Sequence, residues 1–249
     1  MYLIDPTVRN GFISGLAESP KYRYALTLPT LSITNQSDIE FAAVKLYRSG
    51  TPFDNQGRTR QSRMQNEADV RATLAPFVEK IWKYFNEAPN TGNTQANFDR
   101  FHEELCELFQ TLFAAAGYAH TYGNAQKMVN MLFKYLTCFS DYNAFAGLFE
   151  HCHIPIDRKI LQALYLYAVP HTTRYGEYQE INPATGKKEN TPWTRMDKAQ
   201  YNILRDAYRI ALAPVVGGHS WLGAEYYIWS HTPLPATGTV AAPVAKFYM

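Results

Sequence analysis

The sequence has little net charge, few charged residues and no long apolar run. Of its 249 residues, 18% are charged, and the formal net charge is only +2. Such a charge gives no general signal for nucleic-acid binding, although it leaves room for a local basic face. No stretch of about 18 apolar residues occurs, so we expect no membrane span. The N-terminus lacks a basic region followed by an apolar run, so we expect no signal peptide and a cytoplasmic location.

Cysteine is scarce, and several catalytic motifs are missing. Cys106, Cys138 and Cys152 are spread through apolar segments, which favours buried thiols over disulfides. The sequence contains no phosphate-binding Gly-rich loop, no GxSxG turn and no HExxH zinc motif. His151 and His153 flank Cys152, but adjacent ligands do not readily complete a tetrahedral site, and no second cluster has zinc spacing. We therefore expect no metal and no cofactor.

Apolar and aromatic residues, in contrast, are abundant and recur at helical spacing. Apolar residues make up 46% of the chain and aromatic residues 14%, a globular composition. Steps of three and four residues between apolar positions predict helices at 67–85, 97–117, 124–139, 158–168, 197–213 and 221–229. The fold class predicted is therefore mainly α, with one helical core domain over residues 65–230.

The two ends are expected to be less regular. Residues 1–64 are predicted to be irregular or extended, with one short helix that a Ser37–Glu40 capping box starts and Gly50 stops. Within them, residues 24–34 alternate apolar and polar positions as a strand or extended arm does, although Pro29 argues against a central strand. Residues 231–249 are Pro-rich and predicted to form an extended tail.

Turn and capping residues divide the rest of the chain. Asn97 is predicted to cap the helix that follows it, and Pro76 to kink or restart the preceding one. Residues 88–95 read as a loop, and the polar, Tyr-rich residues 170–192 as an insert with a hairpin or mobile turn at 182–188. Pro214 is expected to stop the helix before it.

The most apolar region, Gly123–Tyr167, contains a helix with one polar stripe. Apolar residues cover most of the helix circumference, which predicts a largely buried helix. The remaining positions are Lys127, Asn130, Lys134 and Thr137. Burying an ammonium without a partner is expensive, so this stripe must face solvent, a cleft or carboxylates.

A carboxylate follows this helix at the start of the next one. Pro155 keeps the residue before it extended, and Asp157 is well placed to cap the helix at 158–168. A capping role alone explains Asp157. A catalytic role explains it as well, and the sequence leaves both interpretations open.

The central stretch resembles the helix-hairpin-helix DNA glycosylases, in particular their archaeal 8-oxoguanine branch. The resemblance rests on the segments KMVNMLFK from Lys127 and IPID ending at Asp157, and covers roughly residues 117–213. The glycine-rich hairpin of that family is reduced here to YGNA at Tyr122. The same stretch is also similar to bacterial and phage proteins that share a pattern of AQK, NM, KYL, PID and PW[ST]R segments, with which no activity is associated.

The glycosylase resemblance implies a DNA substrate and a definite chemistry. Lys127 would attack the sugar C1′ of a flipped nucleotide and form a Schiff base, and Asp157 would activate it or stabilise the cationic sugar. The substrate-binding positions it implies are Asn130, Lys134, Trp193, Arg195 and Asp197. Phosphates of the DNA backbone would contact Arg58, Arg60, Arg63, Lys187 and Lys188, which otherwise belong to solvated loops.

Two other classes of function remain open. The first is a non-catalytic helical interaction protein of phage or mobile-element origin, for example a defence or anti-defence factor, in which Lys127 and Lys134 face solvent and the partner is a protein. The second is a helical RNase or toxin, although no Arg-x-x-x-x-His pair stands out. The sequence does not determine the oligomeric state.

Overall fold

The structure, a computed structural model, describes residues 4, 6–50, 64–87, 94–216 and 220–231. The predicted fold class is confirmed, because the described chain is mainly helical and its only sheet has two strands. Within these ranges, no helix combines the length and the apolarity that crossing a membrane requires.

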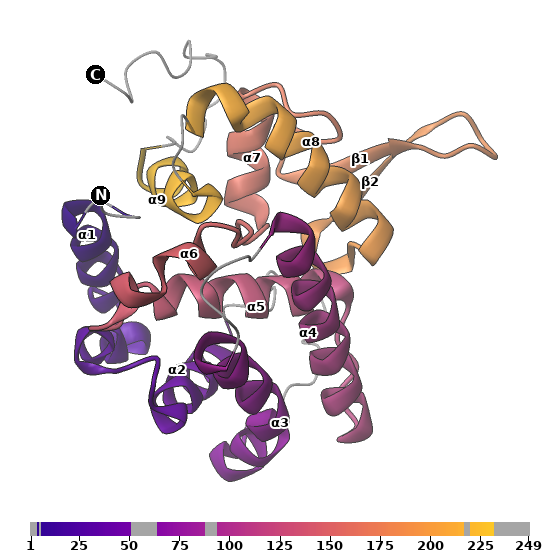
Figure 1. Cartoon of the computed structure of the whole chain (residues 1–249). Coiled ribbons are helices and arrows are strands. Elements are labelled where there is room, and N and C mark those ends of the chain that lie inside the picture. The colour runs from indigo at the N-terminus through magenta and orange to yellow at the C-terminus, as the bar shows by residue number, and fades with distance from the viewer. Residues whose placement is uncertain (1–3, 5, 51–63, 88–93, 217–219, 232–249) are drawn as a thin grey trace.

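The helix α5 (Tyr122–Leu136) is the centre of the molecule, and every one of its residues is buried. It contacts α2 (Gln36–Ser49), α4 (Gln95–Ala115) and α8 (Lys198–Val216), and it crosses the middle of Figure 1. The helix α3 (Glu67–Asn86) packs on α2 and α4. Complete burial of α5 means that its polar stripe must find partners inside the protein.

The N-terminal part is more helical than the sequence predicts. It contains α1 (Pro6–Ala17) and a 3-10 helix, Pro20–Thr30, so the extended arm predicted at 24–34 is wrong over most of its length. The buried positions of this 3-10 helix are Ala25 and Leu28, three residues apart, as its period requires. The helix α1 packs on the C-terminal α9 (Trp221–His231), which joins the two ends of the described chain.

Two predicted caps lie close to the true ones but are wrong. The side chain of Asn35, rather than Ser37, caps α2 by accepting from the Ser37 amide at 3.1 Å. Thr94, rather than Asn97, caps α4 by accepting from the Asn97 amide at 3.2 Å. In both cases several residues with capping side chains lie within one turn, and the backbone path selects which of them is used.

Two prolines lie inside helices that continue through them. Pro76 is inside α3, and α8 runs to Val216, past Pro214, where the sequence predicts a stop. A proline removes the hydrogen bond to the carbonyl four residues earlier. Those residues, Ala72 and Ile210, are exposed, so water can bind the carbonyl that loses its partner.

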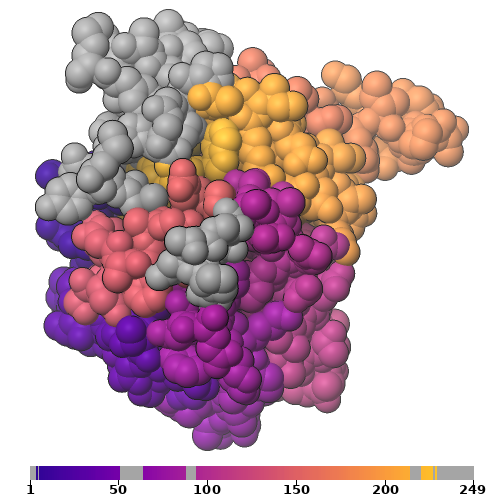
Figure 2. All heavy atoms as spheres, in the orientation of Figure 1, coloured from indigo at the N-terminus to yellow at the C-terminus, as the bar shows by residue number. Residues whose placement is uncertain are grey.

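The segment after α5 contains Asp157 and the hairpin. It comprises the 3-10 helix Tyr142–Phe145, α6 (Ala146–Phe149), α7 (Arg158–Leu166), the strands β1 (Glu177–Ile181) and β2 (Lys188–Pro192), and the 3-10 helix Trp193–Arg195. The strands form the predicted hairpin, antiparallel with Glu177 opposite Pro192. Figures 1 and 2 show this hairpin projecting away from the helical body. Its root packs on α7.

Candidate active site

Lys127 and Asp157 come together where two helices begin. Lys127 lies in the second turn of α5, and Asp157 immediately precedes α7. The Nζ of Lys127 donates to Oδ2 of Asp157 at 2.6 Å. The lysine side chain is 4% exposed and the aspartate side chain 19%, so the carboxylate is the member of the pair that solvent reaches.

Asp157 has a second partner, which confirms its predicted capping role. Its Oδ1 accepts from the backbone N–H of Ile160 at 2.9 Å, as an N-cap residue does. The two carboxylate oxygens therefore have different partners, one on each helix. Capping and ion pairing occur together, so the geometry permits both roles that the sequence leaves open.

Gln126 holds the segment before Asp157 against α5. Its side-chain nitrogen donates to the Ile156 carbonyl at 2.7 Å, and its side-chain oxygen accepts from the Ile156 N–H at 3.1 Å. Asn130, one turn further along, donates to the Ile154 carbonyl at 3.2 Å. Because Gln126 precedes Lys127 and Ile156 precedes Asp157, these bonds set the register of the charged pair.

The N-terminus of α5 is held by the segment that follows the hairpin. The backbone N–H of Gly123 donates to the Met196 carbonyl at 2.9 Å, and the Thr121 hydroxyl donates to the Thr194 carbonyl. A Cβ on Gly123 would overlap the carbonyl oxygen of Trp193, so only glycine allows this close approach. The truncated glycine motif at Tyr122 therefore serves packing between backbones of this chain.

A second buried ion pair lies two turns further along α5. The Nζ of Lys134 contacts Oε2 of Glu225 on α9, and both side chains are 1% exposed. The ammonium also lies 4.2 Å from the ring centre of Phe12 and 4.4 Å from that of Tyr226, in cation–π geometry. The polar stripe of α5 thus faces carboxylates, which is one of the three environments that the sequence allows.

The charges of each ion pair shift the pKa values in the other pair. Burial raises the pKa of Asp157. The nearby Lys127 ammonium and the Ile160 N–H, with a smaller effect from Lys134, lower the pKa by more than burial raises it, so the pKa lies below its ordinary value. Burial lowers the pKa of Lys134, and Glu225 only partly offsets this. Asp157 is therefore a carboxylate at neutral pH.

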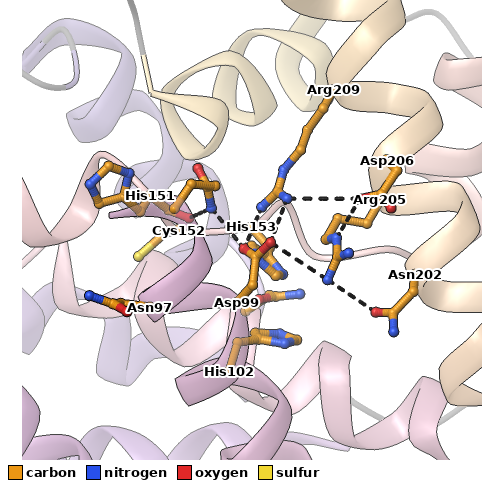
Figure 3. Close-up of polar contacts among 12 residues, drawn as sticks. Asn97, Asp99, His102, His151, Cys152, His153, Asn202, Arg205, Asp206 and Arg209 are labelled. Carbon is orange, nitrogen blue, oxygen red and sulfur yellow. Dashed lines mark hydrogen bonds and ion pairs between the residues drawn. The ribbon is translucent and has the colours of Figure 1, made fainter. Parts of the chain in front are cut away.

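A third polar cluster surrounds Asp99 of α4 (Figure 3). Arg209 donates to both carboxylate oxygens of Asp99 at 2.8 Å, and Arg205 lies 3.8 Å away. The Nε2 of His153 is 2.9 Å from Asp99 Oδ1, and its Nδ1 is 2.8 Å from the hydroxyl of Tyr201. The cluster joins α4 and α8 to the segment that leads to Asp157.

Burial of His153 should make the stability of the protein depend on pH. Burial lowers the pKa of His153 to about 4 from its ordinary 6.5. A lowered histidine pKa means that the unfolded chain takes up the proton first, so stability is present above pH 6.5 and is lost as pH falls towards 4. We expect the free energy of unfolding to fall by about 1.4 kcal/mol per pH unit for each such histidine. Urea unfolding between pH 7 and pH 4 measures this.

The control for this prediction separates His153 from the other buried histidines. Burial also lowers the pKa of His102 and His120, so they contribute to the same slope. The variant His153→Gln should therefore take up about one proton less on unfolding at pH 5. Proton uptake equal to that of the unchanged protein would contradict the prediction.

The residues that the resemblance names for substrate binding lie in different environments. Asn130 and Lys134 are buried on α5 and bonded inside the protein. Trp193 is 8% exposed, whereas Arg195 is exposed. Asp197 caps α8, because its Oδ1 accepts from the Gln200 N–H at 2.8 Å. Their substrate-binding roles stay predictions.

The residues predicted to contact phosphates are only partly described. Lys187 and Lys188 are exposed at the far end of the hairpin. Arg58, Arg60 and Arg63 lie outside the described residues, as does the tail predicted at 232–249. None of these predictions is tested by the arrangement of the described residues.

Three residues in these polar clusters have roles that no sequence motif predicts: Gln126, Glu225 and Asp99. Glu225 is a lone carboxylate in an aromatic helix, and Asp99 lies on the polar face of α4. Gln126 precedes Lys127 but lies outside the predicted stripe. The signal available for Gln126 was its place in a helix otherwise expected to be buried, since a buried amide needs hydrogen-bond partners.

The histidine and cysteine residues near 151–153 have separate roles. His153 points to Asp99, and the three cysteines are buried and unpaired as disulfides. Over the part of the chain that the structure describes, no three His, Cys, Asp or Glu side chains are grouped as metal ligands.

Comparison of the chain with protein-family models, with curated proteins and with solved structures finds no match.

Proposed function

We propose that the chain is a base-excision glycosylase and lyase that acts on DNA through Lys127. The observation that carries this proposal is the contact of 2.6 Å between Lys127 Nζ and Asp157 Oδ2 at the start of α7. It supports the glycosylase interpretation because that chemistry needs an amine and a carboxylate within reach of one sugar carbon. The resemblance of the segments around both residues to helix-hairpin-helix glycosylases supports it as well.

The reaction divides between the two side chains. Asp157 or a water accepts a proton from the Lys127 ammonium, and the free amine attacks C1′ of the sugar. The electron pair of the glycosidic bond leaves with the base, which takes up a proton. After the nitrogen loses a second proton, the C1′–O4′ bond breaks, O4′ takes up a proton, and the protonated C1′=N Schiff base forms. A carboxylate held 2.6 Å from the nitrogen is placed both to accept the first proton and to stabilise the cationic sugar.

Access to the amine would be gained on the side of Asp157. The Lys127 side chain is 4% exposed and that of Asp157 is 19% exposed, so a sugar would meet the carboxylate first. The extruded nucleotide would thus bind where the N-terminal ends of α5 and α7 meet.

Borohydride trapping tests the proposal. We expect a covalent adduct with DNA that carries oxidised, deaminated or abasic sites, complete loss of this adduct in Lys127→Gln, and an unchanged adduct in Lys159→Gln. Lys159 is the matched control because it lies on the first turn of α7, close in sequence to Asp157. The proposal is contradicted if the folded protein gives no adduct on any of these substrates and shows no salt-sensitive DNA binding.

Asp157→Asn separates catalysis from capping. Asparagine caps helices about as well as aspartate, so the cap of α7 is kept, and any loss of stability comes from the ion pair that the buried Lys127 loses. The carboxylate is lost, and the single-turnover rate should fall by about 10²- to 10⁴-fold, the usual contribution of general acid–base catalysis. A rate equal to that of the unchanged protein would leave Asp157 with its capping role only.

A second candidate is a non-catalytic helical interaction protein of phage or mobile-element type. The solvent-facing lysines that the sequence suggests for this candidate are wrong, because Lys127 and Lys134 are buried and paired with Asp157 and Glu225. These two pairs account for both charges of the stripe without a substrate, which still favours this candidate. This candidate expects no adduct with any of these substrates. The trapping experiment therefore distinguishes the two.

A further inference from the structure

The root of the hairpin presents an exposed aromatic ring beside the first turn of α7. Tyr175 is 53% exposed, although Thr173 and Gly176 on either side of it are buried. The Nε of Arg158 donates to the Tyr175 carbonyl at 3.3 Å, and Arg158 directly follows Asp157. The exposed ring is thus tied to the residue next to the proposed reactive carboxylate.

The backbone that carries this ring is held tightly. The Gly176 N–H donates to the Thr173 carbonyl at 3.0 Å, which closes a turn with Arg174 and Tyr175 at its corner. The Thr173 hydroxyl accepts from the N–H of Tyr175 at 3.3 Å and from that of Glu177 at 3.2 Å. Gly176 adopts a left-handed φ of 74°, and a Cβ there would overlap Arg158. The turn Thr173–Gly176 therefore holds its exposed ring on a fixed backbone.

Two arginines lie at this turn. The guanidinium carbon of Arg174 lies 4.6 Å from the centre of the Tyr175 ring. Arg158 adds a second guanidinium at the Tyr175 carbonyl, and the neighbouring carboxylate of Asp157 is already paired with Lys127. A ring backed by a guanidinium, with further positive charge nearby, suits a flat π-system joined to an anion, which is the chemistry of a nucleotide.

We propose that the Thr173–Gly176 turn is a nucleobase-stacking site, in which Tyr175 stacks on a base neighbouring the nucleotide held at Lys127 and Asp157. The inference rests on the proposed function, since it places a DNA strand at the start of α7. It adds a substrate contact to that site. Stacking on one aromatic ring tolerates any base, so Tyr175 contributes affinity more than sequence preference.

Binding of an oligonucleotide with 2-aminopurine beside a stable abasic analogue tests this inference on the full chain. Tyr175→Ala should raise the dissociation constant by about 5- to 100-fold, the range that base–aromatic stacking supplies, and abolish the quenching of 2-aminopurine. Tyr175→Phe should bind as the unchanged protein does. Tyr165→Ala is the matched control, because Tyr165 is 42% exposed at the far end of α7.

The outcomes separate this inference from the proposed function. If borohydride traps an adduct and Tyr175→Ala binds the oligonucleotide as tightly as the unchanged protein, the stacking site is wrong and the lysine chemistry stands. If binding depends on Tyr175 but no adduct forms, the stacking site stands and the lysine chemistry fails. Absence of all DNA binding overturns both.

Discussion

Glu225→Gln should lower the free energy of unfolding by about 3–5 kcal/mol, as expected when one partner of a buried ion pair is removed. The substitution leaves the Lys134 ammonium without a carboxylate in a place where both side chains are only 1% exposed. Burial already lowers the pKa of Lys134, and Glu225 is the group that chiefly opposes this. Urea unfolding at pH 7 measures the change.

Two controls make this prediction specific. The first control is the surface pair of Lys83 and Glu79, whose side chains are 50% and 51% exposed. Glu79→Gln should change the free energy of unfolding by less than about 1 kcal/mol. The double variant Lys134→Met with Glu225→Leu should be neutral or more stable by about 1–4 kcal/mol, because apolar side chains avoid the desolvation cost. Phe12 and Tyr226 already supply aromatic contacts there. Equal losses in the single and double variants would contradict this account.

The double variant also bears on function. A buried pair that can be replaced without loss of stability is retained for another reason, and Lys134 lies two turns from Lys127 on the same face of α5. If the double variant folds but traps less DNA, the second pair tunes the first electrostatically. If trapping is unchanged, the second pair is structural only.

The polar stripe of α5 shows how far the sequence could be read. Helical periodicity was enough to predict a buried helix with charges that need partners, and Asp157 could be named because it opens the next helix. Glu225 could not be named, because its pairing with Lys134 depends on how α9 folds back over α5. That approach is set by packing between segments far apart in the sequence, which local periodicity does not contain.

The role of Gly123 at the start of α5 also depends on tertiary contacts. From the sequence, Gly123 suggested a remnant of a DNA-binding hairpin. In the structure it allows the Trp193 carbonyl to come close, a contact between two segments that only the folded chain brings together. The helix caps behaved differently: Asn35 and Thr94 were missed by two or three residues, since neighbouring side chains compete for one cap. Local chemistry thus placed most helices from α2 onwards, although it missed the N-terminal helices, and the tertiary contacts assigned the partners.

Asp99→Asn should lower the free energy of unfolding by about 3 kcal/mol, because hydrogen bonds to charged groups contribute about 1.5–3 kcal/mol each and here several are lost together. The arginines Arg205 and Arg209 are only 14% and 15% exposed, so water compensates them poorly. Asp206→Asn is the control: Asp206 also pairs with Arg205 but is 59% exposed, and its loss should cost less than about 1 kcal/mol.

The pH dependence of Asp99→Asn distinguishes Asp99 from His153, because the two side chains titrate in different pH ranges. Burial raises the pKa of Asp99, but Arg209 and His153 lower it more, so its pKa lies well below the ordinary 3.8. A lowered carboxyl pKa contributes stability above pH 3.8 that is lost only as pH falls below it. The loss caused by Asp99→Asn should therefore be constant between pH 7 and pH 5 and shrink below about pH 4. A loss that already shrinks at pH 6 would show that Asp99 is not held as a carboxylate by its arginines.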